Sequence, residues 1–213
     1  MHPLAGLLIS YVLGSIPAAY MAGKLARGID LRQHGSGNLG ATNVYRVLGA
    51  KTAIVVLLID ALKGALPVLL LPGMTSTSHP ERWAVAYGIA AIAGHVRPVF
   101  LLWKGGGKGV ATAAGVFFAL APLAMLVTTI VWMTVVYASG YVSLASLASA
   151  LVLPAALLAL GAGPQSEILW VALAVSVFVF WTHRANIGRL RRGEESRFGR
   201  KSAGSSGGSG SRG

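Results

Sequence analysis

Long uncharged apolar runs alternate with shorter polar segments along most of the chain. The first run, residues 4–23, has no charged residue over twenty positions, about the length that an α-helix needs to cross a bilayer. No basic segment precedes it, so we expect a retained anchor rather than a cleaved signal peptide. The pattern predicts an all-α integral membrane protein. Further apolar runs occupy residues 52–71, 83–103, 110–137, 143–160 and 168–182.

Polar residues interrupt two of these runs. Asp60 and Lys63 lie in the second run, and their i,i+3 spacing places them on one helix face, where they neutralise each other. Charge inside a membrane marks a bundle interior or a functional site, and the sequence leaves both roles open. Residues 95–98 interrupt the third run with a histidine, an arginine and a proline, so its helix is expected to end near Gly94.

The fourth run decides the number of spans. Residues 110–137 are twenty-eight uncharged positions that include Pro122, so they form either one long helix or two helices folded back at the proline. Residues 184–201 carry seven basic groups, which the positive-inside bias places in the cytoplasm with the loops at 24–51 and 104–108. This placement requires an odd number of spans. We therefore expect a bundle of about seven transmembrane helices with cytoplasmic glycine-rich loops and an outer N-terminus.

Composition supports this class and narrows the choice of partners. Hydrophobic residues make up 54% of the chain and charged residues 11%, whereas a soluble domain has roughly 25% charged residues. The net charge of +12 comes from basic residues between and after the spans, so nucleic acid is not an expected partner. Cysteine is absent, which removes disulfides and thiolate chemistry. We expect one membrane domain over residues 1–201 and a disordered Gly/Ser-rich tail over residues 202–213.

A polar stretch between the first two runs has the composition of an anion-binding loop. Glycine exposes backbone N–H groups, short hydroxyl and amide side chains add donors, and an arginine adds a planar cationic fork. The stretch matches G-x-G-x-x-G, but that dinucleotide fingerprint has meaning only between a strand and a helix, and membrane spans flank it here. The candidate residues are Ser36, Gly37, Asn38, Gly40, Thr42, Asn43 and Arg46.

A second loop of glycines and cations follows the third apolar run. It is not a Walker A loop, because glycine stands where that motif has Ser or Thr and the leading glycine is missing. Glycines in either loop alone are equally consistent with tight turns and helix packing. Two such loops on one membrane face instead favour a site for more than one phosphate-like charge. The candidates here are Lys104, Gly105, Gly106, Gly107, Lys108 and Gly109.

Polar residues at the expected cytoplasmic ends of other spans are further candidates. His183 and Asn186 are three positions apart, so they point into one site if the helix continues through them. His95 lies at the end of the third span. Ser143 and Ser146 begin the sixth span, where helix capping, interhelical hydrogen bonding and substrate contact all remain open.

The carboxylates exclude several chemistries. Only six are present; Glu81 and Glu167 are predicted on the opposite face, and Glu194 and Glu195 lie in a basic tail. These carboxylates therefore disfavour carboxylate-rich metal sites and two-carboxylate hydrolysis. We expect no metal and no cofactor. No Ser-His-Asp arrangement is convincing, and no carboxylate is expected to orient either histidine. Chemistry that uses donors, cations and a histidine fits group transfer from a donor with a good leaving group.

Three blocks of sequence carry a family resemblance. They are residues 35–43, residues 94–100 continuing into 108–112, and residues 183–187, and an Asp-x-x-Lys-Gly-x-x-Pro run begins at Asp60. In these blocks the chain resembles the bacterial membrane acyl-phosphate:glycerol-3-phosphate acyltransferases, the PlsY family. One departure is that the family loop usually reads Lys-Gly-Gly-Lys-Gly, whereas here three glycines separate the two lysines.

The resemblance implies a seven-helix bundle in the bacterial cell (inner) membrane with its site facing the cytoplasm. It implies transfer of an acyl group from acyl-phosphate to the 1-hydroxyl of sn-glycerol 3-phosphate, giving lysophosphatidate and inorganic phosphate for phospholipid synthesis. Acyl-CoA and acyl-carrier protein are not the implied direct donors. The implied partners are membrane lipids and, as a functional link, the enzyme that makes acyl-phosphate.

The candidates divide between the two substrates in the mechanism that we expect. The first loop and the glycines at 105–109 bind acyl-phosphate and stabilise its leaving phosphate. Arg46 and Lys108 hold glycerol phosphate together with His183, Asn186 and Ser143. The base is left open between His95, His183 and a phosphate of the bound substrate, with the phosphate favoured. The expected catalytic set is Ser36, Asn38, His95, Lys108, His183 and Asn186.

Two other classes of protein remain as alternatives. A small transporter of phosphate-bearing metabolites would suit glycine loops and intramembrane charge, although the polar loops gather on one face and no inverted repeat is visible. A purely structural membrane protein would leave three anion-binding segments without a purpose.

Overall fold

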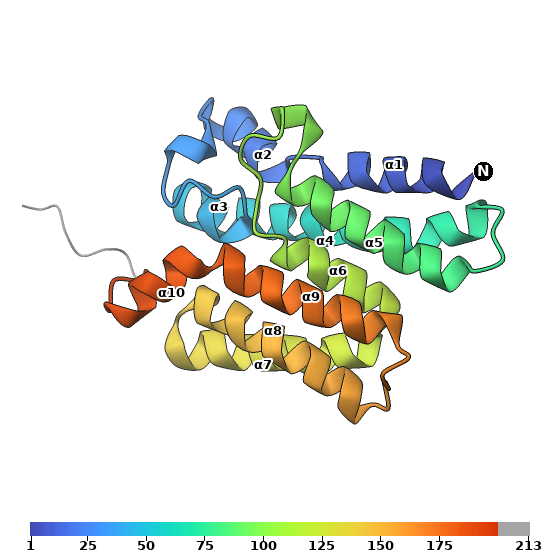
Figure 1. Ribbon diagram of the computed structural model, residues 1–213. Coiled ribbons are helices and arrows are strands. Elements are labelled where there is room, and N and C mark those ends of the chain that lie inside the picture. The colour runs from blue at the N-terminus through green and yellow to red at the C-terminus, as the bar shows by residue number, and fades with distance from the viewer. Residues whose placement is uncertain (200–213) are drawn as a thin grey trace, which may run out of the picture.

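The computed structural model describes residues 1–199, which form a bundle of helices without a strand in that range (Figure 1). The expected tail at 202–213 lies outside the described residues. Two short 3₁₀ helices, η1 (Leu31–Gln33) and η2 (Val99–Leu101), lie in the polar connections. The α-helices are α1 (Pro3–Gly14), α2 (Ala18–Arg27), α3 (Ala41–Leu48), α4 (Ala50–Met74), α5 (Pro80–Val96), α6 (Val110–Leu120), α7 (Pro122–Ser139), α8 (Val142–Ala159), α9 (Glu167–Thr182) and α10 (Arg184–Arg191).

Most of these helices have the length and composition of membrane spans. Five stretches within residues 1–199 qualify by themselves, and α9 with α10, bent by 57°, qualifies as a sixth. Helix α6 is apolar but has only 11 residues. The predicted membrane bundle is confirmed, whereas the count of seven depends on α6 and stays a prediction.

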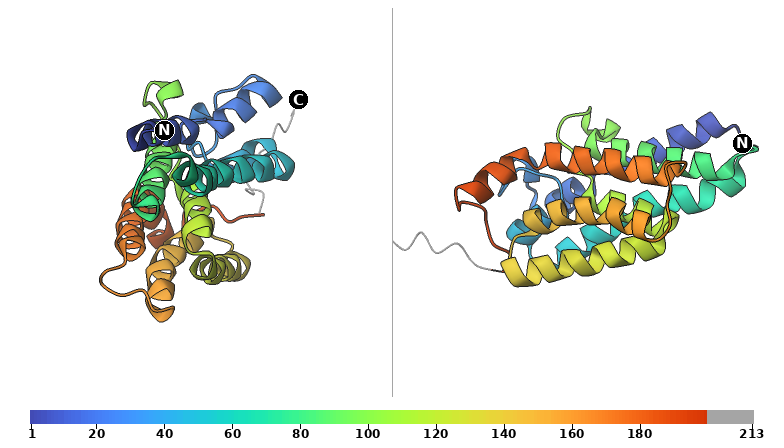
Figure 2. Two further views of the ribbon diagram at one scale, coloured as in Figure 1. Left: turned by 90° about the vertical axis from the view of Figure 1, so that its right-hand side faces the viewer. Right: turned by 60° about the horizontal axis from the view of Figure 1, so that its bottom comes forward.

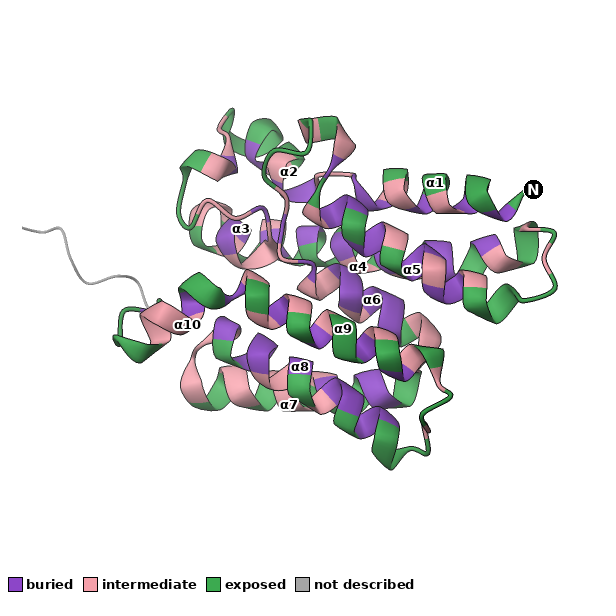
Figure 3. Ribbon diagram, viewed as in Figure 1, coloured by how far each residue is buried: buried purple, intermediate pink, exposed green. Residues whose placement is uncertain are grey.

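The outer surface of the bundle is apolar, as a lipid-facing surface must be. Large side chains point outward along the helices, with Leu8 65% and Val177 72% exposed, and exposed residues line the outer side of each helix (Figure 3). Small residues let the helices approach closely inside. Gly115 of α6 packs so tightly on α4 that an added Cβ would collide with the carbonyl oxygen of Ala61.

The first predicted span is broken. Residues 4–23 were expected to form one helix, but α1 ends at Gly14 and α2 begins at Ala18. The break leaves the Ile16 carbonyl free of a helical partner, and the ammonium group of Lys63 on α4 donates to it at 2.8 Å. Pro17 at the break has no N–H for a helical bond. The polar connection is therefore buried against α4 rather than left in lipid.

The predicted boundaries elsewhere are partly right. The run at 110–137 divides at Ala121, immediately before Pro122, which confirms the expected split. Helix α5 continues to Val96, two residues beyond the expected end at Gly94. The segment at 24–51 is not simply a loop, because it contains the end of α2, η1 and the amphipathic helix α3.

The polar connections gather at one end of the bundle. The segments between α2 and α4 and between α5 and α6 lie at the end opposite the N-terminus, together with α10 (Figure 1). The right-hand view of Figure 2, turned about the horizontal axis, keeps the same arrangement. Helix packing thus brings together the three sequence blocks that were singled out above.

Candidate active site

The first polar loop is shaped by one buried asparagine. The side-chain oxygen of Asn43, on α3, accepts a hydrogen bond from the Ser36 backbone N–H at 2.8 Å. Its amide group donates to the carbonyls of Leu31 and His34 at 3.2 and 3.0 Å. Asn43 was predicted to bind substrate, but its polar atoms are occupied in holding residues 31–36 against α3. Ser36 is left exposed at the tip of the loop.

A hydrogen bond from Arg32 joins the first loop to the second. The guanidinium of Arg32 contacts the Asp30 carboxylate at 2.6 Å and donates to the Lys104 carbonyl at 3.1 Å. Hydrogen bonding by Arg32 holds the pKa of the Asp30 carboxyl below its usual value, against the opposing effect of burial. Neither Asp30 nor Arg32 was among the predicted site residues, because their spacing gives no sign of the contact with residue 104.

The second loop lies directly on the end of α5. The Gly107 N–H donates to the His95 carbonyl at 3.3 Å, and a Cβ on Gly106 would collide with the carbonyl oxygen of Val96. Only glycine permits this approach. The two lysines of the loop differ in position, since Lys104 is exposed and Lys108 is half-buried.

Lys108 is the first member of a hydrogen-bonded chain of four side chains. Its ammonium group donates to the side-chain oxygen of Asn186, and the Asn186 amide donates to Glu195 Oε1 at 2.7 Å. Arg189 Nε lies 2.6 Å from the other carboxylate oxygen of Glu195. Lys108 and Asn186, predicted from separate blocks, are therefore brought into direct contact.

Glu195 was assigned to a basic tail, and this assignment was wrong. The residue is only 7% exposed, because the segment after α10 folds back across the polar end of the bundle. Its Phe198 N–H donates to the Gly140 carbonyl at 2.7 Å, and the Phe198 ring stacks on Tyr45 of α3 with centroids 4.2 Å apart. Tyr45 precedes Arg46, so this segment reaches the helix that carries a predicted phosphate ligand.

Burial changes the ionisation of this chain of side chains. Desolvation lowers the pKa of the Lys108 ammonium from 10.5 to about 8; Glu195 opposes the shift, while Arg189 and Arg46 add to it. Burial by itself would raise the pKa of the Glu195 carboxyl, but hydrogen bonds from Asn186 and Arg189 outweigh it and lower that pKa. Lys108 and Arg189 lie near Glu195, and Arg46 adds a third cation beside Lys108. One carboxylate among three cations leaves an excess of positive charge suited to a phosphate dianion.

His183 lies beside this chain at the junction of α9 and α10. Its Nδ1 is 2.9 Å from the Val179 carbonyl, and the side chain is 3% exposed. The predicted pairing with Asn186 through a continuing helix needs one modification, because the helix bends by 57° between Thr182 and Arg184. Both side chains are nevertheless buried at the same junction.

The two predicted serines have different surroundings. Ser146 donates back to the Val142 carbonyl at 2.9 Å, a bond within its own helix. Ser143 Oγ is fully buried and makes no hydrogen bond of good geometry within residues 1–199, but it lies beside Glu195 and helps to lower the pKa of that carboxyl. A buried hydroxyl that is not committed to its own helix and lies beside Glu195 is better placed to contact a ligand, so Ser143 remains the stronger candidate of the two.

His95 has a carboxylate neighbour that the sequence did not predict. Its Nδ1 lies 3.5 Å from Asp60 Oδ1, and Asp60 is paired with Lys63 at 2.8 Å. The expected neutralisation of Asp60 by Lys63 is confirmed. The expectation that no carboxylate orients either histidine was wrong, because packing of α4 on α5 places Asp60 beside the ring.

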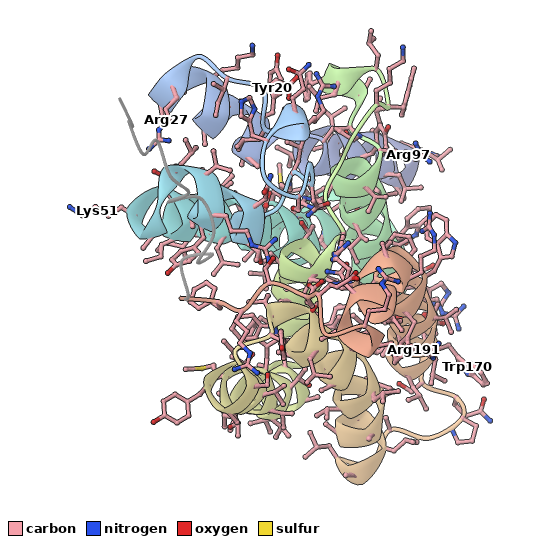
Figure 4. All side chains as sticks on the ribbon, turned by 90° about the vertical axis from the view of Figure 1, so that its left-hand side faces the viewer. Tyr20, Arg27, Lys51, Arg97, Trp170 and Arg191 are labelled. Carbon is pink, nitrogen blue, oxygen red and sulfur yellow. The ribbon has the colours of Figure 1, made fainter. Side chains whose placement is uncertain are left out.

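The remaining candidates lie on the two loops and on α3, and they make no side-chain hydrogen bonds of their own among the described residues. Arg46 is exposed on the last turn of α3. Figure 4 looks onto this end of the bundle, where side chains of α3, α6 and α10 converge, while Arg27 and Lys51 point away at its edge. Asn38, Thr42, Gly37 and Gly40 are half-buried, Gly109 is buried and Gly105 is exposed.

Fold and site together define an integral membrane protein with a cationic, glycine-lined site at one end of its bundle. Comparison with known proteins makes the class specific. The model of the glycerol-3-phosphate acyltransferase family matches residues 4–193. A glycerol-3-phosphate acyltransferase of Trichlorobacter lovleyi is 48% identical over 189 residues, covering 89% of this chain and 94% of the relative. One from a Synechococcus species is 46% identical over 195 residues, covering 92% and 94%.

Solved structures agree with the sequence relatives. The crystal structure of PlsY (YgiH), an integral membrane glycerol 3-phosphate acyltransferase in its glycerol 3-phosphate form, superposes with a TM-score of 0.84 at 39% identity, covering 92% of this chain and 96% of that one. The lysophosphatidic acid form gives a TM-score of 0.81 at 38% identity, covering 92% and 95%. The chain belongs to the glycerol-3-phosphate acyltransferase family and is a membrane acyltransferase.

Proposed function

We propose that the protein transfers an acyl group from acyl-phosphate to the 1-hydroxyl of sn-glycerol 3-phosphate. The products are 1-acyl-sn-glycerol 3-phosphate and inorganic phosphate. The reaction takes place at the cytoplasmic face of a bacterial inner membrane and supplies phospholipid synthesis. An enzyme that makes acyl-phosphate is the functional partner that this chemistry requires.

The observation that carries the proposal is the contact between Lys108 and Asn186 beside Arg46, Arg189 and His183. Several cations face a single carboxylate there, and the side-chain oxygen of Asn186 fixes the Lys108 ammonium. This arrangement suits the phosphate of glycerol 3-phosphate, and relatives of this chain have been solved with glycerol 3-phosphate and with lysophosphatidic acid.

The donor assignment is supported by the second set of anion-binding groups. In these two loops the backbone N–H groups of Ser36, Gly37 and Gly107 are already used inside the protein, whereas those of residues 38–40 and 105–106 have no acceptor within residues 1–199. The loops meet where Gly107 approaches the Leu39 carbonyl. A phosphate on this second surface would be the leaving group, and N–H donors there stabilise the charge that develops on it. Acyl-phosphate is an activated donor, so attack by the glycerol hydroxyl needs only proton removal, by a histidine or by a bound phosphate.

Acyl transfer is tested with detergent-purified protein, labelled glycerol 3-phosphate and two donors in parallel, acyl-phosphate and acyl-CoA. We expect labelled lysophosphatidate and released phosphate from acyl-phosphate alone. Product from acyl-CoA alone would keep the acyl transfer and overturn the donor. Absence of product from either donor, in protein shown to be folded, would overturn the proposed reaction.

A further inference from the structure

The side chains of Asp60, Lys63 and His95 form a buried ionisable cluster between α4 and α5. They are 1%, 6% and 6% exposed. Asp60 Oδ1 lies 2.8 Å from Lys63 Nζ and 3.5 Å from His95 Nδ1. Burying three ionisable groups inside a membrane bundle is costly unless they are fully paired or have a function.

The pairing within the cluster is incomplete. Lys63 is accounted for, because it pairs with Asp60 and donates to the Ile16 carbonyl at the break between α1 and α2. Asp60 Oδ1 and His95 Nδ1 are both buried, yet neither has a hydrogen bond of good geometry within residues 1–199. Apolar side chains could replace a cluster that served only to hold helices together. Helix packing therefore does not explain why an ionisable side chain, His95, is buried next to Asp60.

The cluster lies directly beneath the two glycine loops. A cavity of about 10 Å³, room for roughly one water molecule, is lined by all three side chains together with Leu39, Gly106 and Gly107. A Cβ on Gly107 would collide with His95 Nε2 and would lie 2.9 Å from the Leu39 carbonyl. Nε2 therefore faces the point where residues 38–40 meet residues 105–107.

Charge and ring geometry give this position a chemical meaning. Nδ1 is directed to Asp60 while Nε2 is directed to the loop junction. A bound anion at Nε2 would favour the imidazolium form, which donates through both ring nitrogens, and one carboxylate would then face two cations. An anion held by the loop N–H groups would receive an additional charge-assisted hydrogen bond from below.

We infer that Asp60 is a positioning residue that holds the His95 ring so that Nε2 binds the phosphate of the donor at the junction of the two glycine loops. The inference rests on the proposed function, because the donor is taken to carry a phosphate. His95 contacts the donor, and Asp60 acts only through His95. Lys63 keeps the Asp60 carboxylate compensated and fixes the break between α1 and α2.

The inference is tested with the double variant Asp60→Asn/Lys63→Met, which removes both charges at nearly constant volume, so that neither member of this ion pair is left buried without the other. We expect it to fold, judged by gel filtration and thermal unfolding in detergent. The kcat/KM for acyl-phosphate should fall about 100-fold, the usual cost of losing one oxyanion donor, with the KM for glycerol 3-phosphate within about twofold of wild type. The control Arg82→Met/Glu167→Gln removes an exposed pair held at 2.9 Å and should leave both constants unchanged.

A second set of variants separates positioning from structural support. In a His95→Gln background, the Asp60→Asn/Lys63→Met change should cost less than about threefold further, since Asp60 acts through the ring. Asp60→Glu keeps the charge but moves the carboxylate, and it should also lower kcat/KM for acyl-phosphate. Should the double variant fail to fold, Asp60→Glu replaces it in the cycle. The inference would be overturned if the Asp60→Asn/Lys63→Met and His95→Gln changes lowered kcat/KM for the donor additively. It would also be overturned if the variants impaired the use of both substrates equally.

The wild-type donor assay distinguishes this inference from the proposed function. Turnover of acyl-CoA but not acyl-phosphate by the wild type would remove the donor assignment itself. If the wild type used acyl-phosphate and every Asp60 variant showed normal donor kinetics, the donor assignment would stand. Only the proposed role of Asp60 would then be wrong.

Discussion

Arg46 and Lys108, two cations of the site, differ in burial, so their substitution should affect the kinetics for glycerol 3-phosphate in different ways. Arg46 is exposed on α3 and has no carboxylate partner among the described residues, so its guanidinium is free to bind phosphate. Arg46→Ala should raise the KM for glycerol 3-phosphate about 10- to 100-fold, the range for one hydrogen bond to a charged group. Steady-state kinetics with saturating donor measure this. Lys51→Ala, at the edge of the same end (Figure 4), serves as the control, and an unchanged KM in Arg46→Ala would remove Arg46 from the site.

Lys108 should give the enzyme a characteristic pH dependence. Burial lowers its pKa to about 8, and only the protonated ammonium attracts phosphate, so its charge is lost as pH rises through 8 rather than through 10.5. A phosphate monoester is already a dianion above a pKa of about 6. We therefore expect kcat/KM for glycerol 3-phosphate to fall as pH increases above 8. In Lys108→Arg, which stays charged at these pH values, any remaining activity should lack this fall.

At the scale of elements, the segment after α10 connects the site to the rest of the bundle. Removing the Glu195 carboxylate frees Asn186 and Arg189, so Glu195→Ala should lower stability by about 2 kcal/mol, as hydrogen bonds to charged groups do. Since the pKa of Glu195 is lowered by folding, this stabilisation is present above its ordinary pKa of 4.5 and is lost as pH falls through the folded value. Thermal unfolding of wild type and variant should therefore differ at pH 7 and converge in acid.

The neighbouring carboxylate provides a matched control for that experiment. Glu194 pairs with Arg192 at 2.7 Å, but both side chains are more than half exposed. Exposed ion pairs contribute little to stability, so Glu194→Ala should unfold at nearly the wild-type temperature. Equal effects of the two substitutions would contradict the structural role assigned to Glu195.

The same elements show how far the sequence alone could lead. Hydrophobic runs predicted the bundle and the break before Pro122, because helix length and proline geometry are local properties. Contacts between distant elements were not predictable in that way. Asp60 reaches His95 only through the packing of α4 on α5, and Glu195 enters the site only because its segment folds back onto α3. The charge pattern alone assigned Asp60 to a pair with Lys63 and Glu195 to a basic tail. Neither the Asp60–His95 contact nor the contacts of Glu195 leave a periodic signal in the sequence.

At the scale of the whole molecule, the distribution of basic residues predicts the orientation in the membrane. The polar end carries the glycine loops, α10 and most basic residues, while the α4–α5 and α8–α9 connections lie at the opposite end (Figure 1). Because basic segments are retained in the cytoplasm, the polar end should face inward. The chain has no cysteine, so single cysteines can report on each end without background.

Two exposed positions, and a half-buried glycine at which an added Cβ would meet no other atom, suit such an experiment. Ser78→Cys lies between α4 and α5, Gly163→Cys between α8 and α9, and Arg191→Cys on α10. A membrane-impermeant maleimide applied to intact spheroplasts should label the first two, and Arg191→Cys only after permeabilisation. Labelling in the reverse order would invert the orientation and place the site away from the cytoplasm. Labelling of Ser78→Cys and Gly163→Cys from opposite sides would mean that the chain crosses an odd number of times between them, and would exclude the seven-span arrangement in which α6 and α7 each cross the membrane.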